Sequence, residues 1–105
     1  MRVWKLTAQD WTSYGGTLWG PDVRHEALPG DEPLCSAQWL HSYEHPLLAV
    51  MHNPIHADFK QPVLWEAEAR GEVKHEGQMK LGSKTLTTLR IVSLPEATTV
   101  QRVAY

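Results

Sequence analysis

The sequence contains almost no cysteine. Its single cysteine, Cys35, has no second thiol with which to form an internal disulfide. The first residues, Met1 to Lys5, lack the apolar stretch of a secretory signal peptide. Disulfides are rare in reducing compartments, so both features lead us to expect a cytoplasmic protein.

Long apolar runs and an excess of positive charge are missing as well. The longest strongly apolar run, Leu47 to Met51, falls far short of the roughly 20 residues that cross a bilayer as a helix. Ten Lys and Arg residues stand against twelve Asp and Glu, for a net charge of −2. Binding to nucleic acid depends largely on neutralising phosphates, and no basic cluster is present. We therefore expect neither a membrane protein nor a nucleic-acid-binding one.

The composition is that of an ordinary globular domain. The chain has 105 residues, 42% of them hydrophobic and 21% charged. No repeat, low-complexity segment or long linker divides it, so we expect one domain over residues 1–105. A hydrophobic core of this size gives only a small free energy of unfolding, and binding a partner or forming a homodimer would increase that free energy.

Tryptophan is abundant for so short a chain. The five residues are Trp4, Trp11, Trp19, Trp39 and Trp65. Trp4 and Trp65 lie in strand-like runs and are expected in the core. Trp11 and Trp19 lie with Tyr14 in a turn-rich stretch, where tryptophan serves either as core or as a recognition surface.

The first half of the chain mixes a strand, turns and a helix. Alternation of polar and apolar residues predicts a strand over residues 2–6, and Gly15-Gly16 predicts a hairpin. The proline-rich residues 21–33 are expected to form an exposed loop, and residues 39–45 a turn. Residues 46–53 predict a short helix, because Pro46 suits the first helical position and Pro54 its end.

The second half is typical of strands. We expect them at residues 63–69, 79–83 and 85–94, with a break at Gly82, and a second helix after Pro95. The fold is therefore expected to be α+β, with an antiparallel or mixed sheet of about four to six strands and one or two short helices. Its expected core is Trp4, Leu6, Leu47, Leu48, Met51, Leu64, Trp65, Leu89 and Ile91.

Four of the six histidines cluster in the middle of the chain, as His41-x3-His45-x6-His52-x3-His56. Imidazole is a good zinc ligand, and two such pairs on helices would form a metal site. Pro46 and Pro54 interrupt both pairs, however, so neither can lie on a continuous helix. We favour histidines that cap, hydrogen-bond or face solvent, and expect no metal or other cofactor.

The same region offers groups for acid and base catalysis. If the protein is an enzyme, the residues that would act are His41, His45, His56 and Glu66, on a nucleotide or an ADP-ribose-type substrate. Glu66 and Glu68, two residues apart on a strand, share one face, which is more often solvated than catalytic. The sequence carries no complete catalytic motif, and a non-enzymatic role is preferred.

Several segments resemble one family of small bacteriophage and prophage proteins of unknown function. The similar segments are Leu34-Cys35, Trp39 to Tyr43, Pro46 to Val50, Asn53 to Ala57, Leu64 to Glu68, Leu81-Gly82, Leu86 to Thr88, and Leu94-Pro95 through Gln101-Arg102-Val103. The resemblance brings no catalytic residues with it. It implies a phage-encoded or bacterial protein in the bacterial cytoplasm.

Small size, aromatic content and this resemblance lead to one preferred hypothesis. The protein is expected to be a non-enzymatic binding or inhibitory module that occupies a host protein through Trp11, Tyr14 and Trp19. The alternatives are the enzyme described above and a virion or assembly component.

Overall fold

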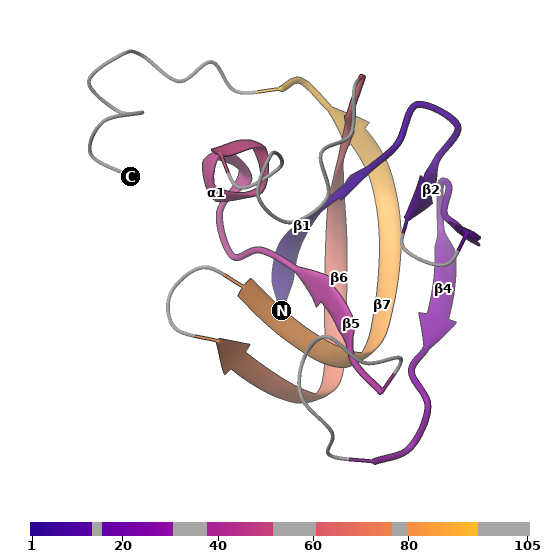
Figure 1. The fold of residues 1–105 in the computed structure, drawn as a ribbon, viewed down its shortest axis with the longest axis vertical. Helices are drawn as coiled ribbons and strands as arrows, with labels where there is room; N and C mark the ends of the chain where they lie inside the picture. The colour runs from indigo at the N-terminus through magenta and orange to yellow at the C-terminus, as the bar shows by residue number, and fades with distance from the viewer. Residues whose placement is uncertain (14–15, 31–37, 52–60, 77–79, 95–105) are drawn as a thin grey trace.

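The computed structural model describes residues 1–13, 16–30, 38–51, 61–76 and 80–94 (Figure 1). They form one small α+β domain, as predicted, with a mostly antiparallel sheet and a short helix. The elements are β1 (Arg2–Thr7), β2 (Thr12–Ser13), β3 (Thr17–Leu18), β4 (Val23–Glu26), β5 (Leu40–Ser42), α1 (Pro46–Met51), β6 (Val63–Glu76) and β7 (Lys80–Val92).

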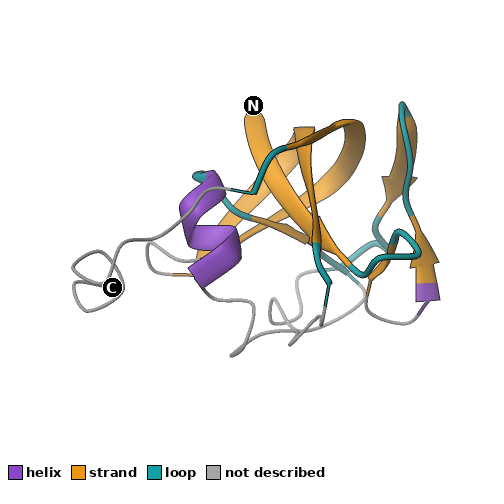
Figure 2. Ribbon diagram, turned by 90° about the horizontal axis from the view of Figure 1, so that it is seen from above, coloured by secondary structure: helices purple, strands orange, loops and turns teal. Residues whose placement is uncertain are grey.

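The long hairpin of β6 and β7 forms the centre of the sheet. Strand β1 pairs with β6, and β4 pairs with the far edge of β7, which gives the order β1-β6-β7-β4. Strand β5 pairs with the same edge of β7 nearer its start, through Leu81 to Ser83. Figure 1 shows α1 and β4 on opposite sides of this hairpin, and Figure 2 shows α1, in purple, against one flank of the strands.

The sheet closes on itself through Tyr43, the residue that follows β5. Its backbone N–H donates to the Trp4 carbonyl at 2.9 Å, and the Trp4 N–H donates to the Tyr43 carbonyl at 2.8 Å. This bridge joins β5 to β1, so β1, β6, β7 and β5 form a small closed ring. Closure gives the sheet an interior and an exterior, and it removes unpaired strand edges where the ring is complete.

Residues on both faces of β1 are buried, on one face inside the ring and on the other under helix α1. The interior cluster consists of Val3, Trp19, Ala67, Ala69, Leu81 and Leu86. A second cluster, between α1 and the outer face of the sheet, consists of Leu6, Tyr43, Ala49 and Leu64. Burying apolar side chains on both sides of one strand gives a small domain more core than a half-buried sheet would provide.

Four of the nine predicted core residues are buried, four are half-buried and one is exposed; the half-buried residues are Trp4, Leu48, Met51 and Leu89. Leu6, Leu47, Leu64 and Trp65 are buried as expected, whereas Ile91 is 51% exposed. The strand pairs Glu66 with Arg90 but Ala67 with Thr88, so one extra residue on β7 shifts the alternation. Ile91 also lies beyond the part of β7 that β4 covers.

Several predicted boundaries are corrected by strand pairing. Strand β4 lies inside the expected loop of residues 21–33, and β5 inside the expected turn of residues 39–45. The strands also continue through Gly71 and Gly82. Gly71, with φ 77°, lies at the register shift between Arg70 and Val73 and permits the bulge there. The helix at Pro46 is confirmed, and the predicted C-terminal helix lies outside the described residues.

Candidate functional site

Trp11 occupies an unusual backbone position at the turn between β1 and β2. Its N–H donates to the Ala8 carbonyl, and the Ala8 N–H donates to the Thr12 carbonyl, both at 2.9 Å. These bonds close a three-residue hairpin loop whose last residue is left-handed, with φ 69° for Trp11. Glycine or asparagine normally takes that position. A tryptophan there costs on the order of 1–3 kcal/mol in backbone strain.

Asp10 stabilises the same turn. One of its carboxylate oxygens accepts hydrogen bonds from the Thr12 hydroxyl at 2.6 Å and from the Thr12 N–H at 3.1 Å. These bonds hold the pKa of the Asp10 carboxyl below its usual value. The turn therefore has a defined geometry, and Trp11 projects from a rigid support.

The Trp11 ring packs edge-on against a buried tryptophan. Its centroid lies 5.3 Å from that of Trp65, at an interplanar angle of 86°. Trp65 is completely buried, and its indole N–H donates to the Thr7 hydroxyl at 3.0 Å. Trp11 itself remains 36% exposed. It covers a core residue with one side of its ring and presents another side to solvent.

The other two residues of the predicted binding surface differ from Trp11. Trp19 is 2% exposed, and its indole N–H donates to the Ser13 hydroxyl at 2.8 Å, so it belongs to the core. Its ring also packs edge-on against His25, with the centroids 4.6 Å apart. Tyr14 lies outside the described residues. Among the described residues of this predicted surface, Trp11 is the one that is exposed to solvent and can contact a partner.

Two further exposed apolar residues lie opposite neighbours of Trp11 in the strand register. Leu18 is 58% exposed and pairs with Thr12, the residue after Trp11. Ile91 is 51% exposed and pairs with Trp65, on which Trp11 packs. We call Trp11, Leu18 and Ile91 the Trp11 surface.

Lys5 is a buried charged residue that the sequence analysis did not identify. It points into the interior of the ring and is only 9% exposed. Its ammonium donates to the His41 carbonyl at 2.8 Å and lies 5.5 Å from the centre of the Trp19 ring. Burial, and secondarily repulsion by Lys80, lower the pKa of Lys5 to about 8. In the part of the chain that the structure describes, no carboxylate forms an ion pair with it.

A buried hydroxyl lies on the strand next to Lys5. The bridge between Trp4 and Tyr43 places Ser42 opposite Lys5 in the antiparallel register. Ser42 is 1% exposed, and its hydroxyl has no hydrogen-bond partner among the residues that the structure describes. The ring interior therefore contains a cation and a polar group that are both incompletely satisfied, which lowers stability.

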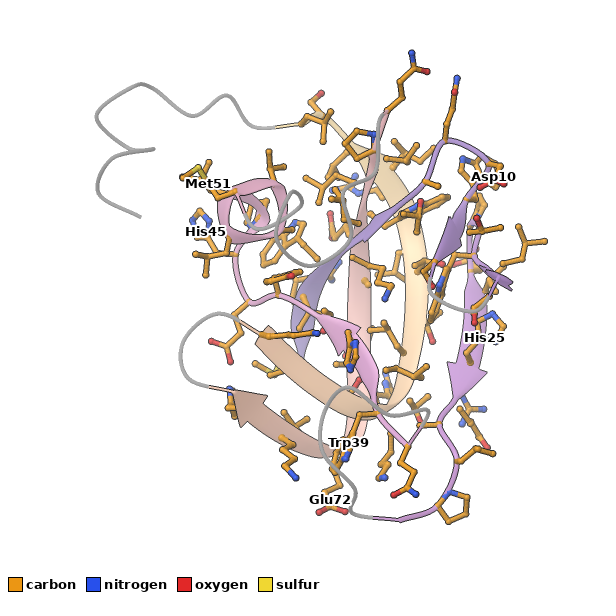
Figure 3. The ribbon with its side chains drawn as sticks, in the orientation of Figure 1. Asp10, His25, Trp39, His45, Met51 and Glu72 are labelled. Atoms are coloured by element: carbon orange, nitrogen blue, oxygen red, sulfur yellow. The ribbon has the colours of Figure 1, made fainter. Side chains whose placement is uncertain are left out.

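The described residues of the predicted catalytic and metal-binding sets, His41, His45 and Glu66, have separate structural roles. His45 lies beside α1 (Figure 3), where its ring Nδ1 accepts the Leu47 N–H at 3.1 Å and caps the helix. His41 lies on β5, and its carbonyl accepts the Lys5 bond. Glu66 is held on the outer face by Arg2 and by Arg90, whose Nε lies 2.9 Å from its carboxylate. This carboxylate is already paired with two guanidinium groups.

Two of the four predicted metal-binding histidines, His52 and His56, lie outside the described residues. Another histidine, His75, forms an ion pair with Glu44 at 3.2 Å when protonated. Within the described ranges, no group of three or more His, Cys, Asp or Glu side chains is arranged to hold a metal ion.

Among the described residues, no helix is long and apolar enough to cross a membrane. The chain matches no protein-family model, no characterised protein sequence and no solved structure.

Proposed function

We propose that the protein is a non-enzymatic binding module that occupies a host protein in the bacterial cytoplasm, with the Trp11 surface as its contact. The observation that carries this proposal is the conformation of Trp11, with φ 69° and 36% of the residue exposed. A bulky residue in a position suited to glycine is a reason to infer a role beyond folding.

The geometry of Trp11 is that of a binding anchor. Tryptophan is enriched among the residues that dominate protein interfaces, because it offers a large apolar area with few rotatable bonds. The hairpin and the Trp65 ring fix its orientation before binding, so little side-chain entropy would be lost on association. Leu18 and Ile91 would extend the apolar contact around it.

The test is capture of a partner by wild-type protein and by the W11G variant. Glycine removes the proposed anchor while suiting the left-handed backbone of that position, so the hairpin should remain folded. A matched control is L28S, which removes a residue that is 60% exposed outside the Trp11 surface. Thermal unfolding of all three proteins confirms that each is folded.

We expect wild type and L28S to retain one stoichiometric protein from bacterial lysate, and W11G to lose it. The affinity of the purified partner should fall at least tenfold in W11G, since loss of an interface anchor costs about 2 kcal/mol or more. Equal retention by W11G and wild type would contradict the proposal.

A further inference from the structure

The outer face of the sheet carries a regular pattern of charges. Strands β4, β7 and β6 lie side by side in that order (Figure 1). Register places two rows across them, Arg24 beside Thr87 and Glu68, and Glu26 beside Thr85 and Arg70. We call these six residues the charged array.

The array is accessible. The side chains of Arg24, Glu26 and Arg70 are 61%, 67% and 76% exposed. Arg24 and Arg70 border an open hollow of about 620 Å³, which Glu68, Thr85 and Thr87 also line. Helix α1 covers the same outer face at its other end, where it packs over Leu6 and Leu64.

The charges of the array are fixed within the chain. Arg24 pairs with Glu26 at 2.7 Å along β4, and Arg70 lies 3.7 Å from Glu68 along β6. A hydrogen bond from the N-terminal ammonium lowers the pKa of Glu68, so its carboxylate is ionised at neutral pH. Two positive and two negative groups therefore stand at the corners of the array.

This arrangement is complementary to itself. An arginine on one side of β7 lies level with a glutamate on the other side, in both rows. A two-fold axis along β7 would bring Arg24 of one copy over Glu68 of the other, and Glu26 over Arg70. A two-fold axis across the strands would bring Arg24 over Glu26, and Glu68 over Arg70. Either axis opposes unlike charges at all four corners, as an interface between identical surfaces requires.

We infer that a second copy of the chain docks on the charged array, with the two sheets face to face. A wholly acidic or wholly basic partner would meet a like charge at two of the four corners, whereas a copy of the chain would place an unlike charge over each corner. The groups that form this contact are polar and exposed to solvent in the monomer, so each ion pair contributes little free energy of association. The dimer therefore forms at high protein concentration, and it dissociates when salt screens the ion pairs.

The experiment is sedimentation equilibrium of two oppositely charged double variants. R24E/R70E makes all four corners acidic, and E26R/E68R makes all four basic. Each variant should be monomeric at concentrations where wild type dimerises in low salt. An equimolar mixture should form a 1:1 heterodimer that dissociates in about 1 M salt, where the screening length falls to about 3 Å.

Two controls separate this contact from general charge attraction and from misfolding. The E72R variant changes an exposed glutamate outside the array, at the foot of Figure 3. It should dimerise like wild type and should show no preference for binding R24E/R70E. Circular dichroism and thermal unfolding establish that every variant is folded.

Two swapped pairs determine the orientation. R24E/E68R keeps the charges opposed for an axis along β7, and R24E/E26R keeps them opposed for an axis across the strands. Dimerisation of one folded variant and not the other supports the inference and identifies the axis. A monomeric wild type in low salt, a mixture that does not associate, or equal behaviour of the two swapped pairs would overturn it.

Discussion

Replacement of the buried Lys5 by methionine should stabilise the protein. Each unit of pKa corresponds to about 1.4 kcal/mol, so a pKa lowered from 10.5 to about 8 means that burying Lys5 costs about 3 kcal/mol at pH 7. Methionine keeps an apolar stem of similar length but has no charge to desolvate. The His41 carbonyl loses its hydrogen bond, a loss of about 1 kcal/mol. We expect the free energy of unfolding to rise by about 2 kcal/mol.

The same residue should make wild-type stability depend on pH. The unfolded chain keeps the Lys5 proton up to the ordinary lysine pKa of 10.5, whereas the folded protein releases it near pH 8. Between these values the unfolded state binds more protons, so stability increases with pH. Burial raises the pKa of Tyr43 to about 12, so stability falls again above pH 10, where the unfolded tyrosine ionises first. Wild type should therefore be most stable near pH 10.

Urea unfolding from neutral to alkaline pH measures both effects. Wild type should gain stability above pH 8, and K5M should start higher and show no such gain. The alkaline decline should persist in both proteins, because Tyr43 is unchanged. A flat wild-type profile, or a K5M variant less stable than wild type at pH 7, would refute the reasoning on Lys5.

Three further substitutions test other parts of the fold. Thr88→Val should lower the free energy of unfolding by about 2 kcal/mol in the urea assay, because the buried Thr88 hydroxyl donates to the Gly20 carbonyl at 2.6 Å. The control Thr87→Val, on the outer face, should change the free energy of unfolding by less than about 0.5 kcal/mol. Trp11→Ala should be about 1 kcal/mol less stable than Trp11→Gly by thermal unfolding, because alanine retains the strain of φ 69°; equal stability would show that this strain is negligible. Lys84→Met removes ammonium bonds of 2.6 Å to two backbone carbonyls and should make limited proteolysis faster than in wild type, whereas an unchanged rate would deny these bonds a stabilising role.

The elements that can be predicted from the sequence are those whose local residue pattern matches the structure they adopt in the folded protein. Alternation in residues 2–6 and the two prolines around residues 46–53 led to β1 and α1, and the paired glycines marked the β2–β3 hairpin. Strands β4 and β5 were missed because they are only four and three residues long and mostly polar. They form strands because they pair with the edge of β7, and that edge exists only in the folded protein.

The candidate sites were predicted less well, for a related reason. The polar residues of an alternating strand are expected to face water, so alternation alone does not predict a buried Lys5. Ring closure through Tyr43, more than thirty residues away in the chain, buries it instead. The backbone angle of Trp11 likewise arises from hairpin register, which composition alone does not specify. Glu66 was correctly placed on a strand, but its pairing with Arg90 depends on a bulge.

The most direct test of the proposed binding function is site-specific photo-crosslinking in bacterial cells. A photoreactive phenylalanine derivative replaces Trp11 in one variant and Leu28, which is 60% exposed outside the Trp11 surface, in another. The proposal predicts one defined crosslinked host protein from position 11 and none from position 28. The absence of an adduct at position 11, or the same set of adducts from both positions, would contradict it.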